Sequence, residues 1–218
     1  MTAQPVGPTT PALVPTTGST EAAATGSTGG ERSGRERVEH AAYELFSRRG
    51  VRGVGVDTVI SEANVAKMTL YRNFGSKDDL VLAFLRRREE LWTRGWLCAE
   101  ARRRGGTPAR QLLAIFEMFD EWFRAPDFEG CVFLTTMLEH PDRDSPVRQA
   151  SIAHLAEIRL FLHQLATEAG AADPEGFARQ WQLLMEGAIV AAVQGDHGAA
   201  RSAGELAELL LHRHRIEI

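Results

Sequence analysis

The sequence predicts an all-α protein, in which a small N-terminal unit of three helices precedes a larger helical region. Apolar residues recur at helical spacing along almost the whole chain after residue 31. Glycine and proline interrupt this pattern at intervals typical of helix ends, and no alternating strand pattern of useful length occurs. Hydrophobic residues make up 44% of the 218 residues, which is enough to bury a core.

Residues 1–30 have a different composition from the rest of the chain. They are rich in Pro, Thr, Gly, Ser and Ala, and they contain one charged residue and no aromatic one. Such a segment cannot offset its ordering entropy by burial, so we expect a disordered tail. It also lacks the basic region and compact apolar stretch of a secretory signal. With no apolar run near the roughly 18 residues of a membrane span, and only two cysteines, the sequence favours a reduced, cytoplasmic protein that contacts no membrane.

The first helices are short and sharply bounded. One apolar face predicts the first helix, which Gly50 ends: Val38, Ala41, Ala42, Leu45 and Phe46. A second apolar stripe runs through positions 56, 59, 60 and 63 and ends near Asn64, a residue that tolerates left-handed backbone. A third helix covers about 66–73. After the break at Gly75, Ser76 is a predicted N-cap for a long helix from Lys77 to about 104.

The remaining helices are predicted at roughly 108–124, 131–139, 145–169, 174–196 and 203–214. The net charge of the chain changes sign near residue 104. Residues 31–104 hold 16 basic against 11 acidic residues, a net charge of +5, whereas residues 105–218 carry a net charge of −8. This asymmetry predicts that only the first half meets a polyanion.

The two short helices at 56–63 and 66–73, joined by a tight turn and preceded by an amphipathic helix, indicate a helix-turn-helix unit. Leu70 and Phe74 lie four residues apart and should face the first helix. Met68 and Arg72 lie on the opposite face. That outward face is the one expected to enter the major groove, since Arg can read guanine bidentately and Met can touch a thymine methyl.

Two stretches resemble the DNA-binding domain of the TetR family of bacterial repressors. They read R-E-R-V-E-H-A-A-Y-E-L-F-S-R-R-G at 35–50 and V-I-S-E-A-N-V-A-K-M-T-L-Y-R-N-F-G-S-K-D-D-L at 59–80. The resemblance implies a helix-turn-helix domain over residues 31–78. The residues that we expect to contact DNA are Lys67, Met68, Thr69, Tyr71, Arg72, Asn73 and Lys77.

Five positions depart from the family pattern. Gly55 and Ala66 replace residues that often contact the DNA backbone, so those contacts are expected to be lost. Asn64 replaces the turn glycine. Met68 and Asn73 replace a glycine and an aromatic residue, and both add groups that can reach DNA. An alternative therefore remains open: a helical effector-binding module in which DNA binding has degenerated.

By the same resemblance, residues 79–218 are expected to dimerise and to bind a small-molecule effector. The chain would then be a ligand-responsive regulator, most simply a repressor that binds a pseudo-palindromic double-stranded operator as a homodimer. Small residues on helix 174–196 and leucines on helix 203–214 predict the dimer contact. Aromatic and Met residues on helical stripes form the candidate effector pocket, with a filled core as the alternative: Trp92, Trp96, Phe116, Phe119, Phe133, Met137, Trp181 and Met185.

An enzymatic function is not favoured. Residues 139–144, EHPDRD, contain the His-Pro-Asp of J-domain cochaperones, but the preceding helix lacks the basic face of such domains, which indicates a loop. His212 and His214 have neither the spacing nor the cysteine partners of a metal site. No nucleophile elbow or P-loop occurs. We therefore expect no catalytic residues, no cofactor and no metal.

Overall fold

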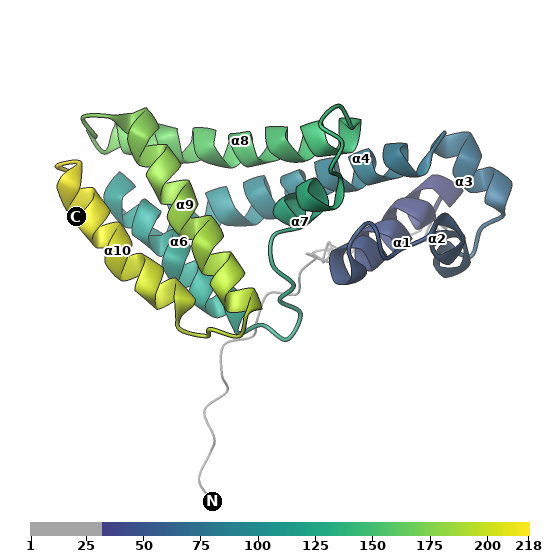
Figure 1. The fold of residues 1–218 in the computed structure, drawn as a ribbon, viewed down its shortest axis with the longest axis horizontal. Coiled ribbons are helices and arrows are strands. Elements are labelled where there is room, and N and C mark those ends of the chain that lie inside the picture. The colour runs from purple at the N-terminus through teal and green to yellow at the C-terminus, as the bar shows by residue number, and fades with distance from the viewer. Residues whose placement is uncertain (1–31) are drawn as a thin grey trace, which may run out of the picture.

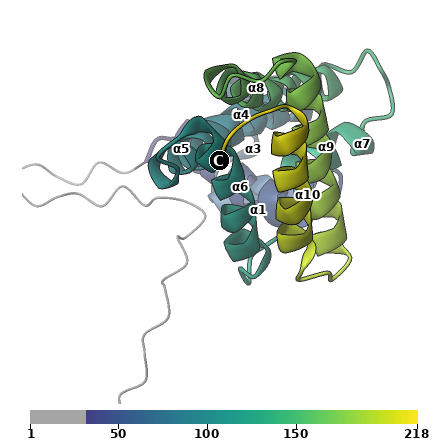
Figure 2. The same ribbon diagram turned by 90° about the vertical axis from the view of Figure 1, so that its left-hand side faces the viewer.

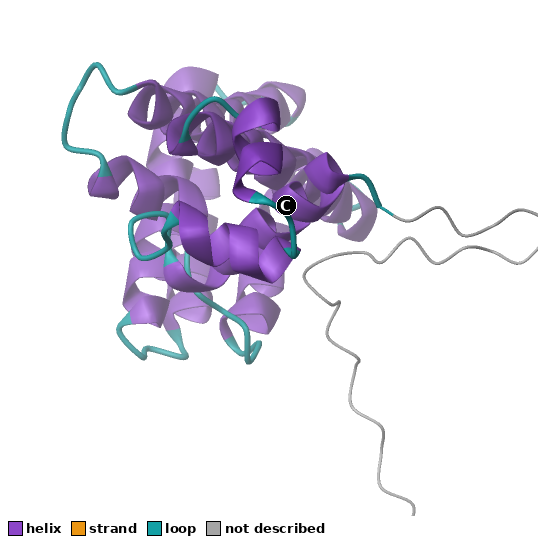
Figure 3. Ribbon diagram, turned by 90° about the vertical axis from the view of Figure 1, so that its right-hand side faces the viewer, coloured by secondary structure: helices purple, strands orange, loops and turns teal. Residues whose placement is uncertain are grey.

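The computed structural model describes residues 32–218, and throughout this range it contains helices and loops but no strand (Figure 3). The predicted tail at 1–30 lies outside the described residues. The all-α prediction is confirmed. The described chain is elongated, with α1 to α3 at one end and α9 and α10 at the other (Figure 1).

The N-terminal unit consists of α1 (Gly34–Arg49), α2 (Val56–Ala63) and α3 (Lys67–Asn73). A capping box begins α1: the Glu36 N–H donates to the Ser33 hydroxyl, and the Ser33 N–H donates to the Glu36 carboxylate at 2.7 Å. Gly50 ends the helix with a φ of 69°. Asn64 takes the left-handed conformation at the end of α2, with a φ of 49°, as its side chain permits. The predicted limits of these helices agree with the observed ones to within a few residues.

The long helix predicted from Lys77 to about 104 covers the right span but is not uniform. It consists of α4 (Lys77–Arg88), a π-helical segment η1 (Glu89–Cys98) and α5 (Ala99–Arg104). A π-helix has more residues in each turn than an α-helix, so its side chains emerge at different angles. The sequence pattern did not reveal this segment, because apolar spacing was read against the α-helical period alone.

Five helices follow: α6 (Pro108–Phe123), α7 (Val132–Glu139), α8 (Pro146–Glu168), α9 (Pro174–Val193) and α10 (Ala199–Arg213). Thr107, Ser145 and Asp173 cap α6, α8 and α9, and each accepts from a backbone N–H three residues later. The start predicted for α10, at 203, was four residues late, because the buried pair Ala199 and Ala200 already belongs to the helix. Figure 2 shows α9 and α10 side by side below α8.

The core runs without interruption from α1 into the C-terminal region. Phe84 of α4 contacts the rings of Tyr43 and Phe46 on α1, with centroids 5.6 and 5.4 Å away. Because α4 packs on α8 as well as on α1, it connects the two ends of the molecule. The domain boundary between residues 78 and 79 stays a prediction, and the core continues across it through α4.

Two further properties concern the hydropathy of the helices and the state of the cysteines in residues 32–218. No helix among residues 32–218 has both the length and the hydropathy needed to cross a membrane. Cys98 and Cys131 are free thiols, and burial raises the pKa of the Cys98 thiol to about 11.

Candidate nucleic-acid interface

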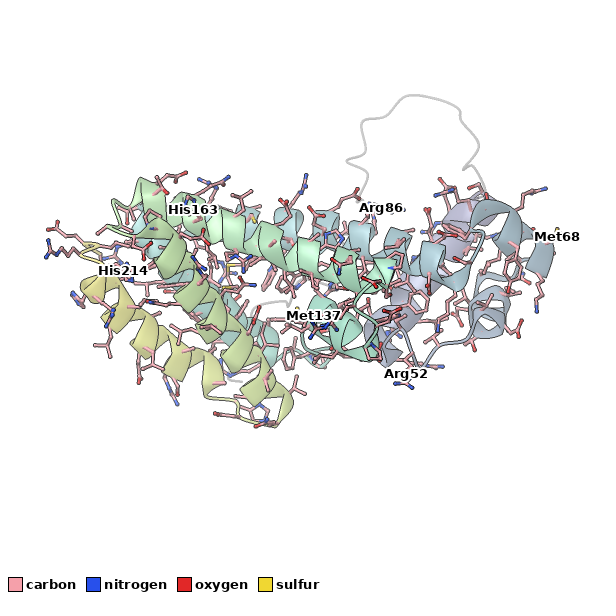
Figure 4. All side chains as sticks on the ribbon, turned by 45° about the horizontal axis from the view of Figure 1, so that its top comes forward. Arg52, Met68, Arg86, Met137, His163 and His214 are labelled. Atoms are coloured by element: carbon pink, nitrogen blue, oxygen red, sulfur yellow. The ribbon has the colours of Figure 1, made fainter. Side chains whose placement is uncertain are left out.

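Helix α3 lies at the tip of the molecule and is held from beneath by two apolar residues. Leu70 is 0% exposed and Phe74 is 3% exposed. On α1, a Cβ added to Gly34 would lie 2.8 Å from the Thr69 methyl group, so glycine at this position allows α3 to approach closely. Figure 4 shows Met68 at the outer end of the molecule.

The face of α3 that points away from the core carries the side chains expected to contact DNA. Met68 is 75% exposed and Tyr71 is 42% exposed. Lys67 and Arg72 are exposed as well, and Thr69 is half-buried. Asn73 differs, because its amide donates to the Thr69 carbonyl at 2.7 Å and is thereby partly committed to the helix.

The two lysines begin successive helices, as expected, but each already has a partner. The ammonium of Lys67 lies 3.2 Å from the Asp57 carboxylate, and both side chains are well exposed. The hydrogen bond and the charge of Asp57 raise the pKa of Lys67. Lys77 donates to the Val51 carbonyl at 2.8 Å and so supports the loop after α1. An ammonium has three donors, so Lys77 can still bind a phosphate oxygen at the start of α4.

Gly55 and Ala66 are the N-caps of α2 and α3, and neither helix has a side-chain capping bond. The first-turn N–H groups are therefore not satisfied by a capping side chain, and a phosphate oxygen is a suitable acceptor for them. With no side-chain cap at either position, the starts of α2 and α3 offer only backbone N–H groups as capping donors.

A contact between the N-terminal unit and α7 was not predicted from the sequence. The Arg52 N–H, in the loop after α1, donates to the Glu139 carboxylate at 3.1 Å, across 87 residues. Beside this bond is a hollow of about 280 Å³ that Lys77 and His140 also line. Arg148 fixes the end of α7 by donating to the carbonyls of Met137 and His140. Glu139 was predicted both as the last residue of the helix at 131–139 and as the first residue of the EHPDRD motif, and no local pattern pointed to this partner.

The eight candidate pocket residues are placed in pairs on four elements: η1, α6, α7 and α9. The five aromatic residues on η1, α6 and α9 lie within one cluster of rings. Trp92 and Trp96 have centroids 5.2 Å apart, and the rings of Phe116 and Trp181 are 5.3 Å apart. On α7, Phe133 instead packs against His154 at 5.1 Å. Met137, also on α7, lies near the middle of the molecule (Figure 4). Met185 is buried on α9.

Trp122, which the sequence did not single out, is central to the cluster. Its ring lies 5.2 Å from Trp92, 5.9 Å from Trp96 and 5.5 Å from Phe119. Six of the eight predicted residues are buried, and none of the eight lines either of two hollows found among residues 32–218. The six buried residues belong to the core, and Trp96 and Met137 pack against it.

Polar groups are enclosed in the same region. The His154 imidazole lies 2.7 Å from the Glu89 carboxylate, which also pairs with Arg94 at 2.6 Å. Three other buried polar atoms make no hydrogen bond: Thr93 Oγ1, Trp181 Nε1 and Gln182 Oε1. Buried groups of this kind usually have a partner, so a ligand that enters here would find donors and an acceptor without one. No group of acidic, His or Cys side chains suited to a metal occurs in the described range.

The far end of the molecule exposes apolar side chains on α9 and α10. The most exposed are Leu183 (67%), Val193 (60%), Leu206 (53%) and Leu209 (65%). The small-residue face predicted for α9 is only partly correct: Gly187 faces open space, but Ala188 is buried inside the protomer. The helix turns Leu183, Gly187 and Val190 outward together, one turn apart.

Comparison with known proteins assigns the N-terminal unit and the C-terminal region to the same family. The family described as "Bacterial regulatory proteins, tetR family" matches residues 40–84, and "Tetracyclin repressor-like, C-terminal domain" matches residues 108–207. The HTH-type transcriptional regulator YjdC of Escherichia coli K12 is 24% identical over 158 residues, 71% of this chain and 81% of YjdC.

Two solved structures are similar over most of their length. The TetR-family regulator SCO4454 of Streptomyces coelicolor is 30% identical with a TM-score of 0.75, over 83% of this chain and 95% of that one. A TetR-type regulator of Streptomyces avermitilis, sav143, is 32% identical with a TM-score of 0.76, over 85% of this chain and 100% of that one.

Proposed function

The chain belongs to the TetR family of transcriptional regulators, and we propose that it is a cytoplasmic repressor that binds its operator as a homodimer and leaves it when an effector binds. The observation that carries this proposal is the outward face of α3. Leu70 is fully buried on the inner side of α3, and Met68 and Arg72 are exposed on its outer side. A helix held in this way can insert into a major groove without losing its own packing.

The side chains of this face divide into two roles. Arg72 reads a guanine edge, and Met68 touches a thymine methyl beside it. The remaining contacts go to the DNA backbone and set the register: Lys67, Thr69, Tyr71, Asn73 and Lys77. Because Lys67 and Lys77 also pair with Asp57 and Val51, phosphate binding at these positions would rearrange or share those partners.

The dimer forms through α9 and α10. Solvent-exposed leucines and valines on two adjacent helices form an apolar surface of the kind that marks protein interfaces, and Gly187 permits close approach of the partner helix. An isologous pair built on this surface carries two copies of α3, which requires a pseudo-palindromic operator.

The effector enters the aromatic region around η1, α6 and α9. Unpaired polar atoms on Thr93, Trp181 and Gln182 supply hydrogen bonds to it, and π-helical segments such as η1 are common at functional sites. Since the aromatic residues fill this region here, binding must displace some of them. Movement at η1 would pass along the continuous helix into α4.

The test is fluorescence anisotropy of labelled DNA from upstream of the gene for this protein, measured across a salt series. Specific binding should weaken steeply with salt, because each phosphate contact releases counterions. Arg72→Ala should relax sequence preference at one base pair in each half-site, at a cost of about 1–3 kcal/mol. Arg110→Ala, an exposed arginine on α6, is the charge-matched control and should leave binding unchanged. Equal affinity for operator and unrelated DNA at every salt concentration would contradict the proposal.

A second candidate has its own supporting observation. Neither α2 nor α3 has a side-chain cap, which is consistent with a helical effector-binding module that has lost operator recognition. In that case the protein would form an intact dimer in solution and bind no promoter fragment at any salt concentration.

A further inference from the structure

A second hollow, of about 70 Å³, lies where the N-terminal unit meets the C-terminal region. Tyr43 and Ser47 of α1 form one wall, and Trp122, at the end of α6, forms another. Val132 contributes from the first turn of α7. The last residue of α4, Arg88, also lines the hollow. None of these five residues belongs to the DNA-contacting face or to the eight predicted pocket residues.

Arg88 is 4% exposed, yet its contacts are neutral. Its guanidinium donates to the Tyr43 hydroxyl at 3.2 Å and lies 5.7 Å from the centre of the Trp92 ring. Among residues 32–218, no carboxylate forms an ion pair with it. Glu129, which also lines the hollow, is influenced by Arg48 instead, which opposes the rise in the pKa of Glu129 caused by burial.

A guanidinium cannot lose its proton in a protein, so this site holds a full positive charge out of water. A buried charge is strongly unfavourable without a partner of opposite sign. Ser47 adds a second unsatisfied group, because its buried Oγ makes no hydrogen bond. The first turn of α7, which begins at Val132, contributes the positive end of a helix dipole. All three features favour an anion at the same place.

We propose that this hollow binds a small carboxylate ligand, whose acid group pairs with Arg88 and accepts a hydrogen bond from Ser47. The planar guanidinium fork matches a carboxylate in two parallel hydrogen bonds. The Trp122 ring provides an apolar wall for a short carbon chain. The hollow has the volume of about two water molecules in the liquid, so it admits only a small acid.

The rim limits the charge of the ligand. Glu44 pairs with Arg48 at 2.9 Å, whereas Asp127 and Glu129 make no ion pair among the described residues and stay at the opening. These two carboxylates repel every anion, and more strongly the higher its charge, so a monocarboxylate is the acid that they disfavour least. A ligand in this position touches α1 on one side and the end of α6 on the other, so it would hold the N-terminal unit against the C-terminal region. The site shares no residue with the DNA-contacting face, but it adjoins the aromatic cluster through Trp122, which lines the hollow, and through Trp92, whose ring the Arg88 guanidinium faces.

The test is NMR of the arginine side chains in the full-length protein, titrated with sodium acetate against sodium chloride at equal ionic strength. The Arg88 Nε–H signal, identified by its loss in Arg88→Gln, should shift and saturate with acetate at about millimolar concentration. Chloride should leave it in place. Arg86→Gln removes an exposed arginine two residues away on α4 (Figure 4) and should bind acetate like the wild type.

Two milder variants keep the test informative if Arg88→Gln does not fold. Ser47→Ala should weaken acetate binding, followed at the Arg88 Nε–H, about threefold. Arg88→Lys keeps the charge but loses the fork and the Arg88 signal, and it should weaken binding about tenfold when binding is followed at the indole N–H of Trp122, which lines the hollow. Wild-type acetate affinity in both variants would overturn the site. A shift of Arg88 by chloride equal to that by acetate would show ionic screening only. Tighter binding of inorganic phosphate or citrate than of acetate would overturn the assignment to a monocarboxylate.

Discussion

Helices α3 and α9 lie at opposite ends of the molecule and differ in how firmly packing and capping hold them. Helix α3 has seven residues and buries one of them, Leu70, whereas α9 has twenty residues and buries seven. Helix α3 also lacks a side-chain cap, while Asp173 caps α9. The position of α3 therefore depends on very few contacts. This dependence leaves most of its side chains free for DNA, and it makes the helix easy to displace.

Leu70→Ala should have the largest effect, because it removes the one buried residue of α3. Removing a fully buried leucine lowers the free energy of unfolding by about 2–5 kcal/mol. Because no other residue of α3 is buried, the amides of residues 67–73 should also lose protection in hydrogen exchange. Denaturant unfolding and exchange mass spectrometry measure the two effects.

The matched control is Leu162→Ala, which truncates an equally buried leucine on α8. It should cost a similar free energy of unfolding, yet protection in α3 should remain at the wild-type level once the lower global stability is taken into account. Equal loss of α3 protection in both variants would mean that the helix is secured by the whole core rather than by Leu70.

The same contrast explains what the sequence revealed and what it did not. Helix limits in the N-terminal unit follow from local chemistry, such as the capping box at Ser33 and the left-handed backbone at Asn64. Leu70 and Phe74 were assigned to the inner face from spacing alone, and the structure buries both. In these cases the controlling residues lie within a few positions of each other.

Features built from distant parts of the chain were not predictable in this way. The bond from the Arg52 N–H to Glu139, and the place of Arg88 between Tyr43 and Trp92, depend on how α4 and α7 pack. Trp122 was overlooked because nothing in its own segment distinguishes it from neighbouring core residues. The aromatic residues were predicted as a pocket lining, and the structure packs most of them tightly. Composition cannot tell a filled core from a cavity.

An intermediate effect is expected at the far end, from Leu209→Glu on α10. The side chain is 65% exposed in the protomer, so the variant should fold normally. Placing a carboxylate in an apolar dimer contact buries an unpaired charge, which should raise the dimer dissociation constant at least tenfold, or about 1.4 kcal/mol. Sedimentation analysis measures it. Leu138→Glu, at a 72% exposed leucine on α7, is the control and should stay dimeric. A dimer unaffected by Leu209→Glu would place the interface elsewhere.

The smallest expected effect concerns Asp57, which pairs with Lys67 at the start of α3. Both side chains are well exposed, so Asp57→Asn should change the free energy of unfolding by less than about 0.5 kcal/mol. The effect of Asp57→Asn on affinity for DNA should be larger. The affinity should rise, because the substitution removes a negative charge beside the phosphates and frees the Lys67 ammonium.

A unit charge at a few ångströms in water interacts by about 1 kcal/mol, so operator affinity should rise up to about fivefold, most at low salt. Anisotropy across a salt series measures it, with Asp78→Asn, an exposed acid on α4, as the control for net charge. An equal gain in both variants would mean that overall charge, rather than release of Lys67, controls binding. No gain in Asp57→Asn would mean that Lys67 does not bind phosphate, and that the start of α3 relies on its backbone N–H groups alone.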